Sequence, residues 1–187
     1  MSMCKRLLLT LCLSGFLVSI GWAASPADVD THVDRLGRPA TEQEIRAWNI
    51  DVSPNGAGLP AGRGTVRQGA DVFAAKCAKC HGATGVEGPA DILVGGHKTL
   101  ATSKPVKTIG SYWPYATTLY DYINRAMPFD APQSLTPDEI YAVIAWLLYR
   151  NEIIAEDAVM DARSLPLVEM PNRQGFIPDP HPGVPRP

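Results

Sequence analysis

Apolar residues recur at three- and four-residue steps in three stretches of this chain, which predicts three helices. We expect these helices over residues 65–79, 117–125 and 137–151. Their apolar faces are Val66, Val72 and Phe73 in the first, Leu119, Tyr122 and Ile123 in the second, and Ile140, Val143, Ile144, Leu147 and Leu148 in the third. No strand-like alternation persists long enough to predict a sheet, so the pattern indicates an all-α fold.

The segment before the first helix is polar and rich in Gly and Pro. Residues 41–44 have the pattern of a capping box and predict a short helix. Trp48, Ile50 and Val52 follow as apolar or β-branched residues, so we expect them to anchor this arm on the domain. The alternative is a loose N-terminal tail.

The chain opens with the pattern of a secretory signal peptide. Lys5 and Arg6 precede an apolar stretch over residues 7–20, and small residues follow. Cleavage is expected after Ala23, with Ala24 as the alternative. A retained membrane anchor would need about 20 apolar residues, so membrane contact is expected only if the signal peptide stays uncleaved. The expected location is the periplasm.

Charge and cysteine content narrow the class of protein. The full chain has 17 Lys and Arg against 19 Asp and Glu. Loss of Lys5 and Arg6 with the signal peptide leaves 15 against 19, a net charge of −4. This balance argues against a nucleic-acid partner. Cys77 and Cys80 are the cysteines that remain, and one close pair in an exported chain is not a disulfide scaffold.

The sequence Cys77-Ala78-Lys79-Cys80-His81 is a Cys-x-x-Cys-His motif, which attaches c-type haem. Two thiols add across the haem vinyl groups, and the histidine that follows supplies an imidazole nitrogen to the iron. The rival interpretations are a zinc half-site and a redox dithiol. Zinc would need a second ligand pair, and a redox motif would suit a βαβ unit; neither is visible in the sequence.

A Gly-rich loop over residues 82–96 follows the motif. Pro89 and Leu93 are expected to pass the haem on the His81 side. A backbone carbonyl of this loop would hold the second nitrogen of His81 and fix its tautomer. His97 is capable of binding a metal, but so close to His81 it is more typical of a loop residue.

Three aromatic residues follow: Tyr112, Trp113 and Tyr115. Their hydroxyl and indole groups could donate hydrogen bonds to haem propionates. The alternative is that they are core aromatics whose polar ends face solvent.

Met127 precedes Pro128, which biases it away from the α-helical region. A thioether in such a turn is a soft ligand suited to haem iron. Met170 also precedes a proline and is the rival, followed by Met160.

The order of helix, Cys-x-x-Cys-His motif, Gly-rich loop, helix, Met-Pro turn and final amphipathic helix resembles a class I cytochrome c over residues 65–151. In that family the first and last helices cross through a glycine and an aromatic residue. The resemblance implies that Gly69 and Phe73 meet Val143 and Trp146. It also implies that His81 and Met127 are the axial ligands of one covalent haem c.

Flanking segments carry a narrower resemblance. Gly37–Thr41, Ile50–Val52 with Gly58–Pro60, Gly110–Thr118 and Met170–Arg173 look like the cytochrome subunit of Sox sulfur dehydrogenase and the cytochromes of related periplasmic sulfite dehydrogenases. In that family the cytochrome takes electrons from a molybdopterin subunit. The Sox subunit is longer and usually carries two haem sites. The single motif here fits a stand-alone or sulfite-dehydrogenase version better.

The expected organisation is a signal peptide (1–23), an N-terminal arm with a short helix (24–64), a cytochrome c domain (65–151) and a Pro-rich C-terminal extension (152–187). The expected function is single-electron transfer from a molybdopterin sulfite or sulfur dehydrogenase to a downstream cytochrome or oxidase, so the chain itself is not an enzyme. The alternatives are a freely diffusing cytochrome shuttle, a haem enzyme or sensor with a displaceable Met127, and a structural haem subunit.

Overall fold

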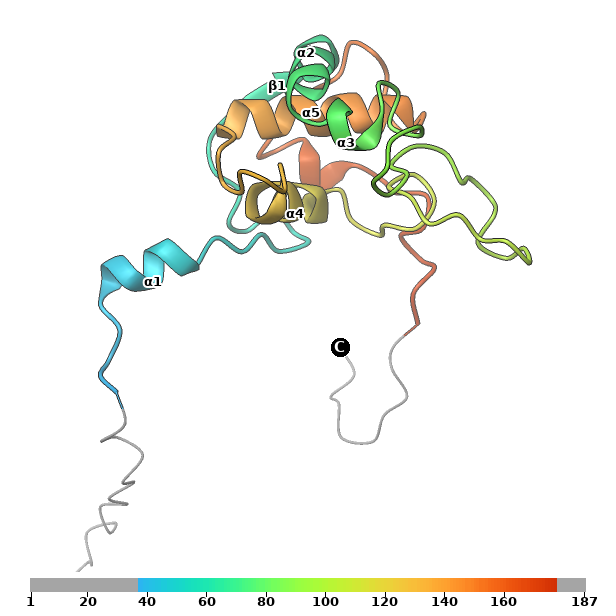
Figure 1. The fold of residues 1–187 in the computed structure, drawn as a ribbon. Coiled ribbons are helices and arrows are strands. Elements are labelled where there is room, and N and C mark those ends of the chain that lie inside the picture. The colour runs from blue at the N-terminus through green and yellow to red at the C-terminus, as the bar shows by residue number, and fades with distance from the viewer. Residues whose placement is uncertain (1–36, 178–187) are drawn as a thin grey trace, which may run out of the picture. The chain divides into compact units, whose positions relative to one another are not determined.

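The computed structural model describes residues 37–177 (Figure 1). The predicted signal peptide and residues 178–187 lie outside that range. The elements are, in order, α1 (Glu42–Trp48), β1 (Arg63–Thr65), α2 (Val66–Lys76), α3 (Ala78–His81), α4 (Thr117–Ala126), α5 (Pro137–Arg150), β2 (Val159–Asp161) and the 3-10 helix η2 (Leu165–Leu167). All of them belong to one compact unit, Thr41–Pro187. Within the described range, no helix combines the length and the apolar character needed to cross a membrane.

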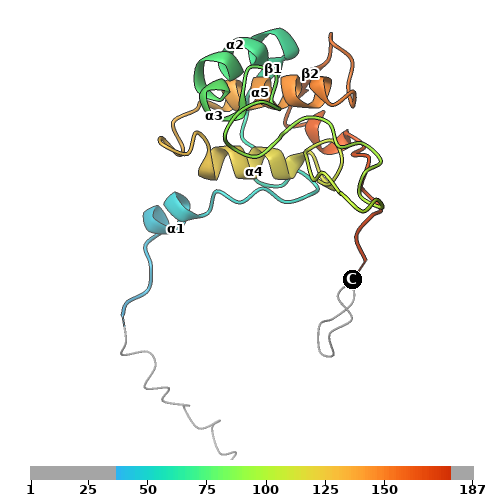
Figure 2. The same ribbon diagram turned by 45° about the vertical axis from the view of Figure 1, so that its right-hand side comes forward.

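Helix α5 is the centre of the core. Every residue from Ile140 to Leu148 is buried, so the helix is covered on all sides. Its start is fixed by a capping box, because the Thr136 side chain accepts a hydrogen bond from the Glu139 amide while the Glu139 carboxylate accepts one from the Thr136 amide. Helices α2 and α4 both pack against α5 (Figure 2).

The crossing of α2 and α5 depends on Gly69. A Cβ atom at this position would fall on the carbonyl of Ala142 and on the Trp146 side chain. One turn later, Phe73 stacks on Trp146 with ring centroids 4.0 Å apart. The Phe73–Trp146 contact implied by the resemblance is therefore confirmed. The closest backbone to Gly69 belongs to Ala142, however, and not to Val143.

The helix expected over residues 65–79 is two elements. Helix α2 ends at Lys76, and Cys77 has a φ of −119°, outside the range of a regular helix. The chain then forms the separate four-residue turn α3. The break allows the Cys-x-x-Cys-His motif to leave the direction of α2.

A two-stranded antiparallel sheet corrects the expectation of a wholly helical chain. Strand β1 pairs with β2, with Gly64 opposite Met160, and Gly64 lies directly against Ala142 of α5. Each strand has three residues, which is too few for an alternation of apolar and polar residues to be recognised in the sequence. The C-terminal segment that follows contributes Leu165 and Met170 to the buried core.

The N-terminal arm is fastened from residue 51 onward. The Val52 amide donates to Asp121 at 2.9 Å, and the Tyr141 hydroxyl donates to the carbonyl of Pro60 at 2.9 Å. Val52 also packs against the core, as expected. The expectation for Trp48 is wrong, since its side chain is 83% exposed. Hydrogen bonds between side chains of α4 and α5 and the backbone beyond α1 hold the arm, and the helix itself contributes no buried residue.

Candidate haem-attachment site

The turn α3 presents both cysteines of the motif. The amides of Cys80 and His81 both donate to the carbonyl of Cys77, at 3.1 and 3.0 Å. Cys77 is half-buried, Cys80 is exposed, and both thiols are free. A single helical turn therefore holds two unpaired thiols and the imidazole that follows them.

His81 is oriented by the loop that follows it. Its Nδ1 atom lies 2.9 Å from the carbonyl oxygen of Asp91. A protonated Nδ1 donates this hydrogen bond, which leaves Nε2 as the metal-binding nitrogen. The prediction that a loop carbonyl holds His81 is confirmed. The loop is tied back by the Ala90 amide, which donates to the Cys80 carbonyl at 2.9 Å, and by Gly88, whose missing side chain leaves room for that carbonyl.

Asn151 is a buried polar residue that the sequence interpretation overlooked. Its Oδ1 accepts from the Gly95 amide at 3.0 Å, and its Nδ2 donates to the carbonyls of Leu93 and Leu147 at 3.2 and 2.9 Å. It therefore joins the end of α5 to the segment next to Asp91. The signal available in the sequence was an asparagine at the predicted end of a helix.

Leu93 and Met127 lie on the border between core and solvent. Both are partly buried and pack against the core cluster, as Cys77 does. Met127 follows α4 in an extended conformation, with φ −125° and ψ 143°, as the following proline predicts. Pro89, by contrast, is exposed. Met160 and Met170 are 5% and 3% exposed within the core, so neither thioether is presented at a surface.

The three predicted aromatic residues have different surroundings. Trp113 is partly buried against the core and meets Tyr122 edge-on at 5.6 Å between ring centroids. Tyr115 lies under the guanidinium of Arg173, 4.3 Å from the ring centroid. Trp113 is thus partly buried against the core, as Leu93 and Met127 are, whereas Tyr115 is engaged by the C-terminal segment.

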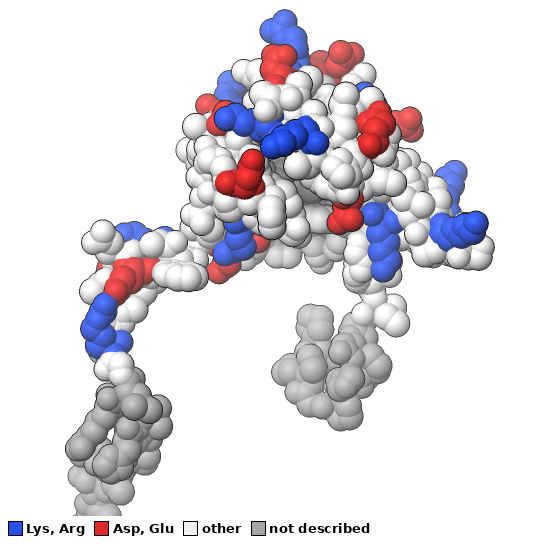
Figure 3. All heavy atoms as spheres, viewed as in Figure 1, with Lys and Arg blue, Asp and Glu red and all other residues white. Residues whose placement is uncertain are grey.

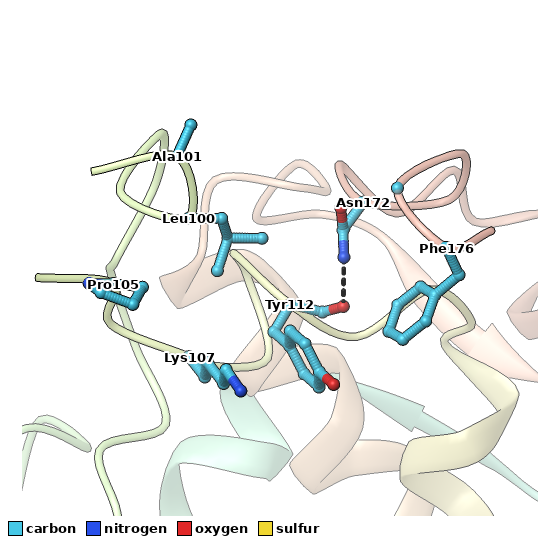
Figure 4. Close-up of a pocket in the computed structure, with 8 residues that line it drawn as sticks. Leu100, Ala101, Pro105, Lys107, Tyr112, Asn172 and Phe176 are labelled. Carbon is cyan, nitrogen blue, oxygen red and sulfur yellow. Dashed lines mark hydrogen bonds between the residues drawn. The ribbon is translucent and has the colours of Figure 1, made fainter. Parts of the chain in front are cut away.

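Tyr112 lines a shallow pocket between the loop after the haem motif and the C-terminal segment (Figure 4). Its ring meets Phe176 at 5.3 Å, and Lys107 lies 4.9 Å from the ring centroid on one face. The side-chain amide of Asn172 donates to the Tyr112 carbonyl at 2.7 Å. These contacts give Tyr112 a structural role in joining the two segments.

The cysteine pair lacks the features of a zinc or redox centre. Within residues 37–177, no three His, Cys, Asp or Glu side chains gather as a metal cluster would require. Burial, and secondarily the neighbouring Cys80, raises the pKa of the Cys77 thiol to about 11. A reactive dithiol needs the opposite shift, because the thiolate is its nucleophile.

The donor set fits a haem c. Two free thiols lie on one turn, the imidazole has Nε2 available, and one methionine lies at an apolar border. Figure 3 shows acidic and basic side chains interspersed over the face in view, and no uniformly basic surface there.

Comparison with known proteins agrees with this geometry. Residues 64–147 match the family model described as cytochrome c oxidase, cbb3-type, subunit III. The structure is similar to that of the sulfane dehydrogenase SoxCD from Paracoccus pantotrophus, with a TM-score of 0.72 and 46% sequence identity over 78% of this chain and 72% of that chain.

The thiosulfate dehydrogenase TsdBA from Marichromatium purpuratum has 26% identity over 48% of this chain and 20% of that chain, with a TM-score of 0.35. A search of curated proteins gave no match. The family model implies a covalently bound haem c and electron transfer as the role of the domain. The chain therefore belongs to the class I c-type cytochromes, in the family that includes the cytochrome subunit of the sulfane dehydrogenase SoxCD.

Proposed function

We propose that this chain is a periplasmic mono-haem cytochrome c that carries single electrons from a molybdopterin sulfite or sulfur dehydrogenase subunit to a downstream cytochrome or oxidase. Bound haem c would supply a one-electron ferric/ferrous couple. A two-electron oxidation of a sulfur compound on the partner would therefore need two successive transfers through this chain.

The observation that carries the proposal is the turn of Cys77, Cys80 and His81, with Nδ1 of His81 held by the Asp91 carbonyl. In the holoprotein, Cys77 and Cys80 would hold the haem as thioethers, and His81 would bind iron through Nε2. The bond to Asp91 fixes the ring orientation and makes the imidazole a stronger donor.

Met127 would be the second axial ligand. A thioether ligand favours the ferrous state and raises the reduction potential. Leu93 and Trp113 are partly buried against the core; next to the haem they would exclude water, which reduces the reorganisation that accompanies electron transfer. Pro89, Tyr112 and Tyr115 stay predicted haem contacts; Pro89 is exposed, and the Tyr112 carbonyl and the Tyr115 ring already contact the C-terminal segment.

The partner is inferred from the similarity to SoxCD, at 46% identity over most of both chains. The exported location is inferred from the signal-peptide pattern of residues 1–23. A periplasmic location also suits haem attachment to Cys77 and Cys80, which takes place outside the cytoplasm in bacteria.

The axial ligand is tested by paired substitutions, Met127→Leu and Met170→Leu, in the haem-loaded protein. We expect Met127→Leu to abolish the long-wavelength sulfur–iron absorption band of the ferric protein, because leucine has no thioether. Met170→Leu should keep the band, since Met170 is buried in the core and the exchange nearly conserves side-chain volume. Retention of the band in Met127→Leu would contradict the ligand assignment.

The partner is tested separately, by purifying the tagged holoprotein from its native source. We expect molybdenum in near-stoichiometric amount and reduction of the haem on addition of sulfite or another reduced sulfur compound. A molybdenum-free monomer that no such compound reduces would contradict the partner and leave the cytochrome assignment intact.

A further inference from the structure

Helix α1 has an apolar face that the described residues, 37–177, leave exposed. Ile45 and Trp48 are three residues apart and therefore share one side of the helix. Their side chains are 44% and 83% exposed, and none of the seven residues of α1 is buried. Trp is the largest apolar side chain, so its exposure on an ordered helix calls for an explanation.

The helix is formed although none of its residues is buried within the described chain. The Glu44 amide donates to the Thr41 hydroxyl at 3.2 Å, and the Thr41 amide donates to the Glu44 carboxylate at 2.8 Å. The Asn49 amide closes the last turn on the Ile45 carbonyl at 2.8 Å. An isolated helix of this length is marginal in water, so most of its stability must come from a surface that covers it.

The chain after α1 is fastened to the cytochrome body. Asp51 pairs with Arg125 at 2.6 Å, and the Val52 amide donates to Asp121 at 2.9 Å. Thr117 donates to the carbonyl of Pro54 at 3.3 Å. Only two residues separate Trp48 from this anchored segment, and α1 stands clear of α4 and α5 in both ribbon views (Figures 1 and 2). A short linker thus joins α1 to the part of the arm that is bonded to the cytochrome body.

The similarity to SoxCD includes this helix. A match over 78% of 187 residues spans about 146 residues. Because only 146 residues lie between Glu42 and Pro187, the match must reach α1. The arm therefore falls within the span matched to a chain of a complex, beyond the residues 64–147 that the family model covers.

We propose that Ile45 and Trp48 of α1 dock into an apolar pocket of the molybdopterin dehydrogenase subunit and anchor the cytochrome to it. This inference rests on the proposed function, because that subunit is the occupant it requires. Trp at the centre of an interface commonly carries a large share of the binding free energy. Docking through α1 would leave the haem site on the cytochrome body available for electron transfer.

The test uses tagged holoprotein from the native source, as wild type, Trp48→Ala and Leu167→Ala. Leu167 is the control, because its side chain is 79% exposed at a position remote in sequence from α1. The readouts are molybdenum per haem after purification and the dissociation constant of the re-mixed purified subunits. We expect Trp48→Ala to weaken association at least about 10-fold, and Leu167→Ala to match wild type. The absorption spectrum of all three proteins should be the same.

Three results would overturn the inference. If wild type and Trp48→Ala bind the molybdenum subunit equally, α1 is not the anchor, although the proposed function stands. If wild type binds no molybdenum subunit, both proposals fail. If Trp48→Ala instead abolishes self-association, or binding to phosphatidylglycerol/phosphatidylethanolamine vesicles, with no effect on the subunit, the occupant is a second copy or a membrane.

Discussion

At the residue scale, the functional geometry depends on polar groups that are buried or held by the backbone. His81 is oriented by the Asp91 carbonyl, and Asn151 fixes the neighbouring segment through two hydrogen bonds, to Gly95 and Leu93. Each of these partners lies on a different element from the residue it holds. A change of a few atoms at Asn151 would therefore act on the haem site without touching the haem.

Tyr141 links α5 to the arm and makes the stability of the fold depend on pH in the alkaline range. Burial is the main reason that its pKa is raised to about 12, and Asp161 adds to the effect. The unfolded chain releases this proton near pH 10, whereas the folded chain holds it to about pH 12. Its contribution to stability is therefore complete below pH 10 and is lost as the pH rises toward 12. Burial also raises the pKa of Tyr120.

We expect Tyr141→Phe to flatten this alkaline decline, measured as the free energy of unfolding in denaturant between pH 8 and pH 11.5. At pH 8 the variant should be less stable by about 1 kcal/mol, because the hydrogen bond to the Pro60 carbonyl is lost. Tyr122→Phe is the control, since Tyr122 is 48% exposed. A decline as steep in Tyr141→Phe as in wild type would contradict this account.

At the scale of elements, the crossing of α2 and α5 sets where the haem motif begins. Gly69 lets the two backbones approach, and the Phe73–Trp146 stack fills the next turn. Helix α2 ends four residues after Val72, and α3 follows almost directly. The placement of α2 on α5 therefore also determines the position of α3 and of His81.

Gly69→Ala should destabilise the protein by about 3 kcal/mol, since the added methyl group would meet the rigid Ala142 backbone and cannot be accommodated by a rotamer change. Equilibrium denaturant unfolding of the holoprotein measures this loss. Ala75→Ser, on the exposed side of the same helix, should cost less than about 0.5 kcal/mol. Equal stability of the two variants would show that the crossing tolerates a side chain.

At the scale of the whole molecule, the C-terminal segment is part of the core. Strand β2 pairs with β1, and Leu165 and Met170 are buried. Up to residue 177, this segment therefore packs on the body although it contains little regular secondary structure.

A pair of neighbouring leucines tests this role. Leu165 has no exposed surface, whereas Leu167, two residues on, is 79% exposed. We expect Leu165→Ala to lower the free energy of unfolding by about 2–5 kcal/mol and Leu167→Ala to change it by less than about 0.5 kcal/mol. If both substitutions had the same small effect, the segment would not contribute to the stability of the core.

The sequence by itself determined the features that depend on neighbours along the chain. The Cys-x-x-Cys-His motif, the caps at Thr41 and Thr136 and the apolar period of α5 are local patterns, and the structure contains each of them. The capping box at Thr65 and Gln68 was equally readable and marks where α2 begins. The extended conformation of Met127 likewise follows from the proline beside it.

Only the tertiary structure decided which distant segments meet. The pairing of β1 with β2 joins residues about a hundred positions apart, and each strand contributes three residues. No local sequence pattern could therefore predict this pairing. The bonds of Asn151 to Gly95 and Leu93 depend in the same way on where the chain returns in space. So do the burial of Met160 and Met170 and the exposure of Trp48. A local pattern can show that a side chain is apolar, but whether it is covered depends on packing between segments far apart in sequence.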